Sequence, residues 1–343
     1  MLKMKNIIYS ISLFVFVVFF VGNTNKLSAQ DPHFGFNTSL IEYQSPGLVG
    51  TQDNQMSFQS VYRNQWRNVG TAFQTYGFSG NAKVTRTTNT TLSVGGFVFN
   101  QSSFSYNSLL AHVSVAANVL LSDGKILTVG LGSGTRYESL NPDDLMWTDQ
   151  FNGYEYDPNI AHGEVFSQEQ KASFDLSAGM SYKFISSDRG GDFFPKSSGT
   201  ISAGFWHLNQ GKRLTLYEEQ ANIKMVFMTD LQFAMGDDKK AAFNPWLLGM
   251  YEGGAYEVLV GADFKFYLKE SEKYGKSRSV VAFGGGYRWQ DAALARVKFD
   301  YANYGIGVLY EINTSSLKEA SKGFGCFEIL LSYSPTKKNF SLY

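Results

Sequence analysis

The segment Ala172-Ser173-Phe174-Asp175-Leu176-Ser177-Ala178-Gly179-Met180-Ser181-Tyr182-Lys183-Phe184 alternates between apolar side chains and small or polar ones without a break. Successive side chains of a β-strand point to opposite faces of the sheet, so this segment predicts a strand with one apolar and one polar face. The same alternation recurs in residues 223–235 and 256–268. The chain is therefore predicted to consist mostly of two-faced strands.

The length of these strands separates a membrane barrel from a soluble sandwich. Strands of soluble proteins usually have about 5–6 residues, whereas strands that cross a membrane need about 9–11. Here the alternating segments run to about ten residues or more, which matches the membrane case. We count about 14 such segments, which begin near residues 55, 71, 91, 109, 126, 171, 198, 222, 243, 255, 279, 292, 303 and 325. The prediction is an all-β fold, a transmembrane outer-membrane β-barrel of about 14 antiparallel strands.

The two faces of the strands predict what each side meets. The apolar face should contact lipid, and the polar face, rich in Gly, Ser, Thr and Asn, suits a lumen that faces water. Charges on the polar face have both signs and are expected to pair across the lumen, because unpaired charges in a confined space are costly. A selective pore is the alternative. These charges are Asp175, Lys183, Glu257, Asp263, Lys265, Arg296, Lys298, Asp300, Glu311 and Glu328.

Aromatic residues near the strand ends predict the girdles that membrane barrels place at the two lipid interfaces. They are Trp66, Trp206, Trp246, Tyr251, Trp289, Tyr301, Tyr304 and Tyr333. The 343-residue chain is 16% aromatic and only 17% charged, with 30 basic and 30 acidic residues. Zero net charge removes the electrostatic basis for nucleic-acid binding, so no nucleic-acid partner is expected. The single cysteine, Cys326, excludes a disulfide framework and a cysteine zinc cluster.

The first residues of the chain predict export. Lys3 and Lys5 precede an apolar run over residues 7–21, and Ser28-Ala29 precedes Gln30, which is the pattern of a signal peptide. A membrane anchor is the alternative, but a spanning helix needs about 20 apolar residues. We therefore expect four parts in a protein of the cell outer membrane. They are a signal peptide at 1–29, a periplasmic segment or plug at 30–54, the barrel at 55–334 and a periplasmic tail at 335–343.

Connection lengths predict the orientation of the barrel. Asp123-Gly124 and Ala302-Asn303 each join two strand segments, and Asp-Gly is a hairpin signal. The longest connection runs from Tyr137 to Gln170. Membrane barrels have short periplasmic turns and longer external loops. If the N-terminal part lies in the periplasm, the turns after even-numbered strands are periplasmic and the 137–170 loop is external. The connections after the sixth and tenth segments, Ile185 to Ser197 and Lys269 to Arg278, are longer than this rule expects, so the agreement is partial.

Motifs toward both ends of the chain resemble those of a known family. They are Gln30-Asp31-Pro32-His33-Phe34, Ser45-Pro46-Gly47-Leu48-Val49-Gly50, Tyr62-Arg63-Asn64-Gln65-Trp66, Gly286-Tyr287-Arg288, the stretch from Tyr304 to Leu317, and Gly325-Cys326-Phe327-Glu328. With them the sequence resembles the PorP/SprF family of type IX secretion-system membrane proteins. The middle of the chain matches loosely, and Ser45, Glu311 and Cys326 stand where the family usually has Asn, Asp and Gly.

The resemblance implies a function as well as a fold. It implies a barrel of the type IX secretion and gliding machinery that binds, delivers or anchors secreted surface proteins, or adhesins, carrying a C-terminal sorting domain. Other type IX components and outer-membrane lipid would be its further partners. A FadL-like or porin-like channel for small solutes is the alternative from the transport class. An outer-membrane lipid hydrolase is a third possibility.

The 137–170 loop is the leading candidate for a binding surface, because it holds eight acidic residues, several aromatic residues and no Lys or Arg. Aromatic side chains anchor interfaces, and charge steers encounter, here with a basic patch on a cargo protein. The expected binding residues are Asp143, Asp144, Trp147, Asp149, Tyr154, Glu155, Tyr156 and Asp157. A solvated loop over the barrel mouth is the alternative. Arg63, Gln65 and Trp66 form a second candidate docking site, with a rim of girdle aromatics and paired arginines as the other interpretation.

No catalytic, cofactor or metal residue is predicted. The four histidines lie in unrelated segments without a metal-binding spacing. Calcium binding by the acidic loop has little support, because an Asp-x-Asp-x-Asp-Gly pattern is missing from the sequence. Gly130-Leu131-Gly132-Ser133-Gly134 lies within an alternating segment without a following helix, so it is expected to serve barrel packing and not phosphate binding.

Overall fold

The computed structural model describes residues 31–161, 163, 169–186, 194–214, 220–271 and 277–335. The predicted signal peptide and residues 336–343 of the predicted tail lie outside these described residues. Within the described ranges, no helix is long and apolar enough to cross a membrane.

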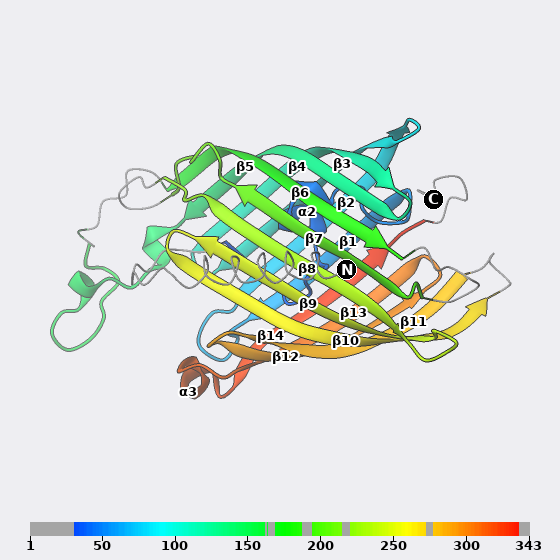
Figure 1. The fold of residues 1–343 in the computed structure, drawn as a ribbon. Helices are drawn as coiled ribbons and strands as arrows, with labels where there is room; N and C mark the ends of the chain where they lie inside the picture. Colours follow the sequence, from blue (N-terminus) through cyan, green and yellow to red (C-terminus); the bar gives the residue numbers. More distant parts are fainter. Residues whose placement is uncertain are drawn as a thin grey trace.

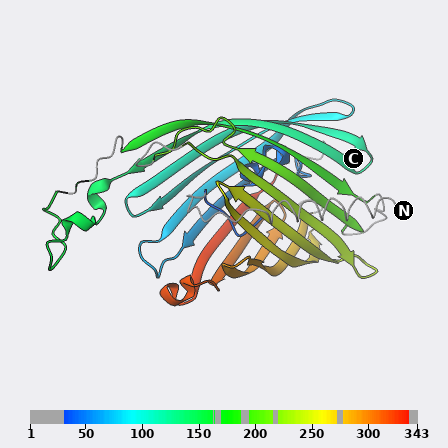
Figure 2. The same ribbon diagram turned by 60° about the vertical axis from the view of Figure 1, so that its left-hand side comes forward.

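Fourteen antiparallel strands close into one barrel, as predicted (Figure 1 and Figure 2). Each strand pairs with its neighbours in sequence, and β1 pairs with β14 to complete the ring. Every strand begins within three residues of its predicted start. The strands are β1 Met56–Gln65, β2 Phe73–Arg86, β3 Thr90–Ser103, β4 Tyr106–Ser122, β5 Lys125–Leu140, β6 Gln170–Ile185, β7 Ser197–Trp206, β8 Lys224–Met235, β9 Ala241–Glu252, β10 Ala255–Ser271, β11 Ser277–Arg288, β12 Ala292–Tyr301, β13 Tyr304–Asn313 and β14 Phe324–Tyr333.

The alternation along the strands places apolar side chains on the outside of the barrel. On β4, Val113 and Val115 are 66% and 58% exposed, whereas Ser114 between them is buried. The same outward row on β6 contains Phe174, Leu176 and Met180. An outer wall of exposed apolar residues around a closed sheet is the surface that a lipid bilayer covers.

The two ends of the barrel differ. The two-residue turns Asp123-Gly124 and Ala302-Asn303 lie at one end, here named the turn end. The connection between β5 and β6 leaves the opposite end, here named the arm end, and its described residues 141–161 and 163 are named the arm. Figure 1 shows the arm standing away from the barrel at the left.

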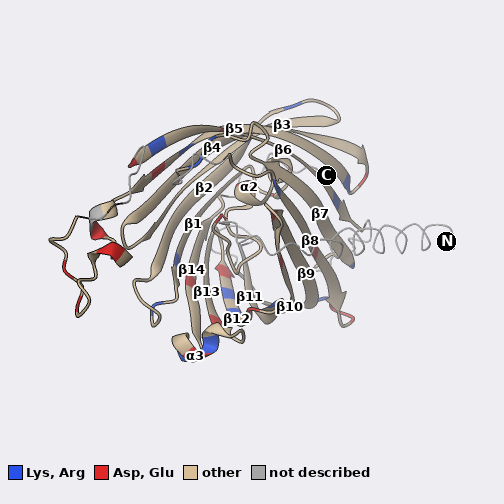
Figure 3. Cartoon of the chain, turned by 90° about the vertical axis from the view of Figure 1, so that its left-hand side faces the viewer, with Lys and Arg blue, Asp and Glu red and all other residues tan. Residues whose placement is uncertain are grey.

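The N-terminal segment runs through the inside of the barrel, where Figure 3 shows it with helix α2 (Ile41–Gln44). Asp31 contacts Arg136 near the arm end of β5, and Asp53 contacts Lys183 near the turn end of β6. Residues 31–53, named the plug, therefore extend along most of the lumen.

The lumen contains a packed apolar core, which differs from the predicted water-facing interior. Phe34, Phe36, Leu40 and Tyr43 of the plug join inward residues of the strands in one buried cluster. The prediction of girdle positions was wrong for Trp206 and Trp246, which are 0% and 2% exposed inside the barrel. These indoles face the plug, and a strand pattern alone does not reveal an apolar partner inside a lumen. Tyr251, Trp289, Tyr301, Tyr304 and Tyr333 do lie on the outer face.

Candidate functional site

Three glycines on neighbouring strands form a cradle for the plug. Gly130, Gly179 and Gly204 lie opposite one another on β5, β6 and β7. They face the plug turn Ser45–Gly47, which overlaps the start of the short helix η1 (Pro46–Leu48). A Cβ atom on Gly130 would lie 2.2 Å from the carbonyl oxygen of Pro46. The glycines therefore allow backbone to meet backbone, which confirms the packing role predicted for residues 130–134.

Hydrogen bonds lock this turn into the cradle. Ser45 Oγ donates to the carbonyl oxygen of Ala203 at 2.9 Å, and Ser181 Oγ donates to that of Gly47 at 2.6 Å. Both are buried or partly buried contacts between the plug and the wall, where an unpaired polar group would be costly. The turn is thus fixed by shape and by directional bonds together.

The two other glycines of the 130–134 segment make room for His112. Cβ atoms on Gly132 and Gly134 would lie 2.7 Å and 2.5 Å from atoms of its imidazole ring. The ring has Ser177 Oγ at 3.5 Å and Asp175 Oδ2 at 3.9 Å, both from the same nitrogen, Nε2. A hydrolytic triad needs the serine and the carboxylate on opposite nitrogens. The group also lies inside the barrel and away from lipid, so it does not have the geometry of an outer-membrane lipid hydrolase.

Four charged residues of the terminal motifs meet in one buried network at the arm end. They are Arg63 on β1, Arg288 on β11, Glu311 on β13 and Glu328 on β14. Arg288 Nη2 lies 2.7 Å from Glu311 Oε1. Arg63 lies 3.2 Å from Glu328 and 3.3 Å from Glu311. The ion pair between Arg63 and Glu328 links β1 to β14, the two strands whose pairing closes the barrel.

This network also holds the plug. The backbone N–H groups of Gly35 and Phe36 donate to the carboxylate of Glu328 at 2.9 and 3.3 Å. His33 lies between Arg63 Nη2, 3.0 Å from its Nε2, and Glu257 Oε2, 3.1 Å from its Nδ1. A neutral imidazole satisfies both contacts, accepting from the guanidinium and donating to the carboxylate. The charged residues of the motifs thus bind the start of the plug.

A second buried cluster surrounds Asp31. Its carboxylate lies 2.8 Å from Arg136, 3.1 Å from His207, 3.5 Å from Arg213 and 3.7 Å from Lys224. Burial alone would raise the pKa of Asp31, but Arg136, Lys224 and His207 hold this pKa well below its ordinary value. These contacts favour the anionic form of Asp31 and fix the first described residue of the plug to the wall.

The sequence analysis did not identify Arg136 and His207 as members of a site. The alternation on β5 places Arg136 on the same inward face as Gly130 of the cradle. This shared face was the sequence signal that could have indicated that Arg136 points into the lumen. His207 lies just after β7, with a backbone φ of 58°, where no strand pattern applies. Its pairing with Asp31 depends on the plug.

Asp31, His207 and Glu252 bring three possible metal-binding atoms within 4.8 Å of one another. The chemistry of the cluster does not suit a metal ion. Arg136, Arg213 and Lys224 already surround the carboxylate of Asp31, and both ring nitrogens of His207 contact carboxylates. A dication would add charge to a region that is rich in cations, so the cluster serves as an anchor for the plug.

Most of the charges predicted on the inward face are paired, but with the plug or with nearby strands and not across the lumen as expected. Lys265 donates to the neutral side chain of Gln232 instead. Arg296 lies 2.6 Å from Asp263 and stacks its guanidinium 4.1 Å from the ring centroid of Trp246. Arg296 also donates to Asn37 Oδ1 of the plug at 2.9 Å. A cavity of about 270 Å³ remains beside this pair in the turn-end half of the lumen.

Glu42 is an exception among the buried charges. Its Oε1 accepts a hydrogen bond from Asn81 at 2.5 Å, but its Oε2 is buried without a hydrogen-bond partner among the described residues. Burial raises the pKa of Glu42 above its ordinary value of 4.5. The folded protein then holds this proton more tightly than the unfolded chain, so stability falls as the pH rises above 4.5.

Glu42→Gln is therefore expected to stabilise the barrel at pH 8, by about 1–2 kcal/mol, because it removes a poorly partnered buried charge. The gain should shrink toward pH 4, where Glu42 is protonated in both states. Thermal unfolding of the purified protein in detergent at the two pH values measures this. The matched control is Glu319→Gln in the exposed helix α3 (Leu317–Ser321), which should change nothing. A lower unfolding temperature for Glu42→Gln at pH 8 would contradict the expectation.

The arm is an ordered projection and not a cover over the barrel mouth. Phe151 and Tyr156 pair across a small hairpin. At its tip, Asn152 Oδ1 accepts from the backbone N–H groups of Tyr154 and Glu155 at 2.9 and 3.0 Å. Gln150 Nε2 closes the base by donating to the carbonyl oxygen of Ile160 at 2.9 Å. Local hydrogen bonds therefore shape the arm independently of the barrel.

The predicted binding residues of the loop are all on the arm. Asp143 and Asp144 lie in the short helix η2 (Pro142–Asp144), and Trp147 donates from Nε1 to the carbonyl oxygen of Pro142. The side chains of Asp144, Asp149 and Glu155 are exposed, and Tyr156 and Asp157 are half-buried. Tyr154 at the tip is 96% exposed. Figure 3 shows acidic residues gathered on this projection.

Other residues that the sequence associated with docking lie elsewhere. Glu138, counted with the acidic loop, is buried in the lumen and lies 3.0 Å from Arg213. Arg63 and Gln65 are also buried and point inward. Trp66, half-buried, follows β1 with a φ of 58°. Of the two candidate surfaces, only the arm is open to a partner along its length.

The fold and site together define an outer-membrane β-barrel with a filled lumen. A family model described as "Type IX secretion system membrane protein PorP/SprF" matches residues 26–333. The chain therefore belongs to the PorP/SprF family. Among proteins with curated descriptions, none matches the sequence.

Several solved structures share the barrel architecture. The "CymD monoaromatic hydrocarbon channel" has a TM-score of 0.47 and 10% identity, covering 88% of this chain and 94% of its own. The Ralstonia pickettii toluene transporter TbuX has a TM-score of 0.47 and 8% identity, covering 88% and 95%. BamA from Haemophilus ducreyi has a TM-score of 0.42 and 12% identity, covering 82% and 70%.

Proposed function

We propose that this barrel binds exported surface proteins carrying a C-terminal sorting domain and delivers or anchors them at the cell surface. Other components of the type IX secretion and gliding machinery would be its partners. Membership of the PorP/SprF family supports this role. The observation that carries it is the arm, an acidic and aromatic hairpin beside a filled lumen. Because the lumen is filled, a partner would bind the exposed surface of the barrel and would not pass through it.

The orientation follows from the connections. We place the turn end in the periplasm and the arm end outside the cell, because short turns are typical of the periplasmic side. The plug then continues into β1 at its periplasmic end, and residue 335 at the start of the predicted tail lies on the same side. The arm is the part of the described chain that extends furthest toward an external partner in this orientation (Figure 2).

The chemistry of the arm suits a basic surface with an apolar pocket. Asp144, Asp149 and Glu155 are exposed, and charges of this kind raise the rate of encounter with a cationic partner. Tyr154 presents an exposed ring from a fixed backbone turn, so little entropy is lost when it is buried by a partner. Tyr154 is thus the expected anchor, and the acids guide the approach.

Tyr154→Ala combined with Asp149→Asn and Glu155→Gln is expected to weaken retention of the cargo at the cell surface. Loss of an aromatic anchor costs about 2 kcal/mol, or roughly thirtyfold in affinity. Surface labelling of the co-exported adhesin in complemented cells measures retention. The control is Lys318→Gln with Glu319→Gln in α3, which is exposed in the connection between β13 and β14 at the same barrel end. Unchanged retention with the arm variant would overturn the role of the arm.

Purification of the full-length barrel from native membranes, followed by mass spectrometry, tests the function as a whole. An exported protein with a C-terminal sorting domain should be recovered with it. Recovery of none would argue against anchoring. The alternative, a channel for small solutes, predicts a steady current through the wild-type protein in a planar bilayer. Because the plug fills the lumen, we expect the wild-type barrel to carry no steady current.

A further inference from the structure

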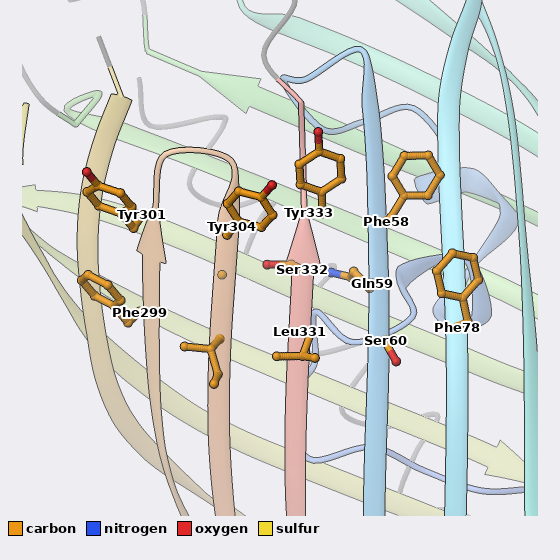
Figure 4. Close-up of a pocket in the computed structure, with 12 residues that line it drawn as sticks. Phe58, Gln59, Ser60, Phe78, Phe299, Tyr301, Tyr304, Leu331, Ser332 and Tyr333 are labelled. Atoms are coloured by element: carbon orange, nitrogen blue, oxygen red, sulfur yellow. The ribbon is translucent and has the colours of Figure 1, made fainter. Parts of the chain in front are cut away.

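A groove lies on the outer wall where the first and last strands meet. It has a volume of about 450 Å³ and extends over strands β12, β13, β14, β1 and β2 (Figure 4). It lies near the turn end, since the β12–β13 turn borders it. The arm and the plug take no part in its lining.

The strand register arranges the groove in two rows. The row nearer the turn end consists of Tyr301, Tyr304, Tyr333 and Phe58, each opposite the next on adjacent strands. Tyr304 and Tyr333 have ring centroids 5.0 Å apart, and Tyr333 stacks on Phe58 at 6.4 Å. This row therefore forms a continuous aromatic wall across four strands.

The second row is apolar and shallow at its centre. Ile306, Leu331 and Ser60 lie opposite one another on β13, β14 and β1. Ser60 is exposed and much smaller than Phe58 in the row above and Phe78 beside it. The hollow exists because Ser60 leaves space between these larger side chains, as Figure 4 shows.

The tyrosine hydroxyls give the groove a polar edge. Those of Tyr301, Tyr304 and Tyr333 have no hydrogen-bond partner among the described residues, and Figure 4 shows them directed toward the turn end of the barrel. A phenol supplies one donor, and a donor at membrane depth needs an acceptor. The apolar hollow therefore matches the acyl chains of a lipid, and the row of hydroxyl donors beside it matches the polar headgroup.

We propose that the groove binds one phospholipid of the leaflet at the turn end. An acyl chain lies over Ile306, Leu331 and Ser60, and the ester and phosphate oxygens accept hydrogen bonds from the tyrosines. These oxygens are acceptors without protons of their own, so they match a row of donors. Tyrosine is also typical of this level in membranes, because its ring is apolar and its end is polar.

Native mass spectrometry of the full-length protein in mild detergent tests the proposal. After purified protein is mixed with phosphatidylethanolamine, the wild type is expected to retain one lipid. Ser60→Trp fills the hollow and should reduce the occupied fraction at least tenfold. The control Val129→Trp introduces the same side chain on the outer face of β5, where Val129 is 51% exposed, and should leave occupancy unchanged.

A second variant separates the polar edge from the hollow. Tyr304→Phe with Tyr333→Phe keeps the aromatic wall and removes two donors, so occupancy should fall severalfold while the barrel stays folded on a semi-native gel. Equal retention by the wild type and all variants would overturn the proposal. A wild-type dimer that Ser60→Trp converts to a monomer would overturn it too, because the occupant would then be a second copy of the chain.

Discussion

Arg63→Met is expected to destabilise the folded barrel by about 3–5 kcal/mol, because it leaves a buried carboxylate without its counter-ion. Among the described residues, Arg63 is the only cationic side chain within ion-pair distance of Glu328, which is 0% exposed. Glu311 keeps its contact with Arg288, so Glu328 bears most of the loss. A lower unfolding temperature in detergent and a smaller folded fraction on a semi-native gel would measure the effect.

Two further variants make this test specific. Arg67→Met removes a nearby exposed arginine and should leave the unfolding temperature unchanged. Arg63→Met combined with Glu328→Gln removes the unpaired charge as well, so it should recover part of the stability. The interaction energy in this cycle isolates the pair from other effects of each substitution. A loss below about 1 kcal/mol for Arg63→Met would place the pair among weak surface ion pairs.

Gly130→Val is expected to displace the plug and to open the lumen. Its new Cβ would lie 2.2 Å from the carbonyl oxygen of Pro46, which is backbone and cannot rotate aside. Overpacking of this kind costs about 1–3 kcal/mol, and we expect the upper end of this range. A planar bilayer should show a current with Gly130→Val that the wild type does not show, together with a lower unfolding temperature.

The matched control for this substitution is Gly70→Val in the connection between β1 and β2. A Cβ on Gly70 meets no atom within 4 Å, so the change should affect neither stability nor current. If Gly130→Val has the unfolding temperature of the wild type and carries no current, the position of the plug does not depend on the cradle. A Gly130→Val barrel that is less stable but still silent would show that the two charged clusters hold the plug in the lumen without the turn.

The fold could be predicted because a barrel repeats one rule along the chain. Alternation fixes which side chains face out, and this rule holds for residues as far apart as Val113 and Leu331. The same rule does not say whether the inward face meets water or protein. Trp206 and Trp246 were misassigned for that reason, since their partner is the plug at the other end of the sequence.

The candidate site was predicted only where it is local in sequence. The acidic and aromatic composition of the loop identified the arm, whose tip is shaped by residues within a few positions of one another. The networks of Arg63 and Asp31 join residues that are more than 100 positions apart, such as Asp31 and Arg136. Such pairings depend on strand register and on the path of the plug, and a short sequence motif predicts neither of these.

The plug also constrains the order in which the molecule assembles. All strand pairs except β1–β14 join neighbours in sequence, so this pair is the one that completes the ring. The plug enters the ring through the residues just before β1 and is held by strands as distant as β5, β7 and β14. A finished ring would have to admit the rings of Phe34 and Tyr43 past its charged wall. We therefore expect the sheet to close around the plug, with the β1–β14 pair forming last.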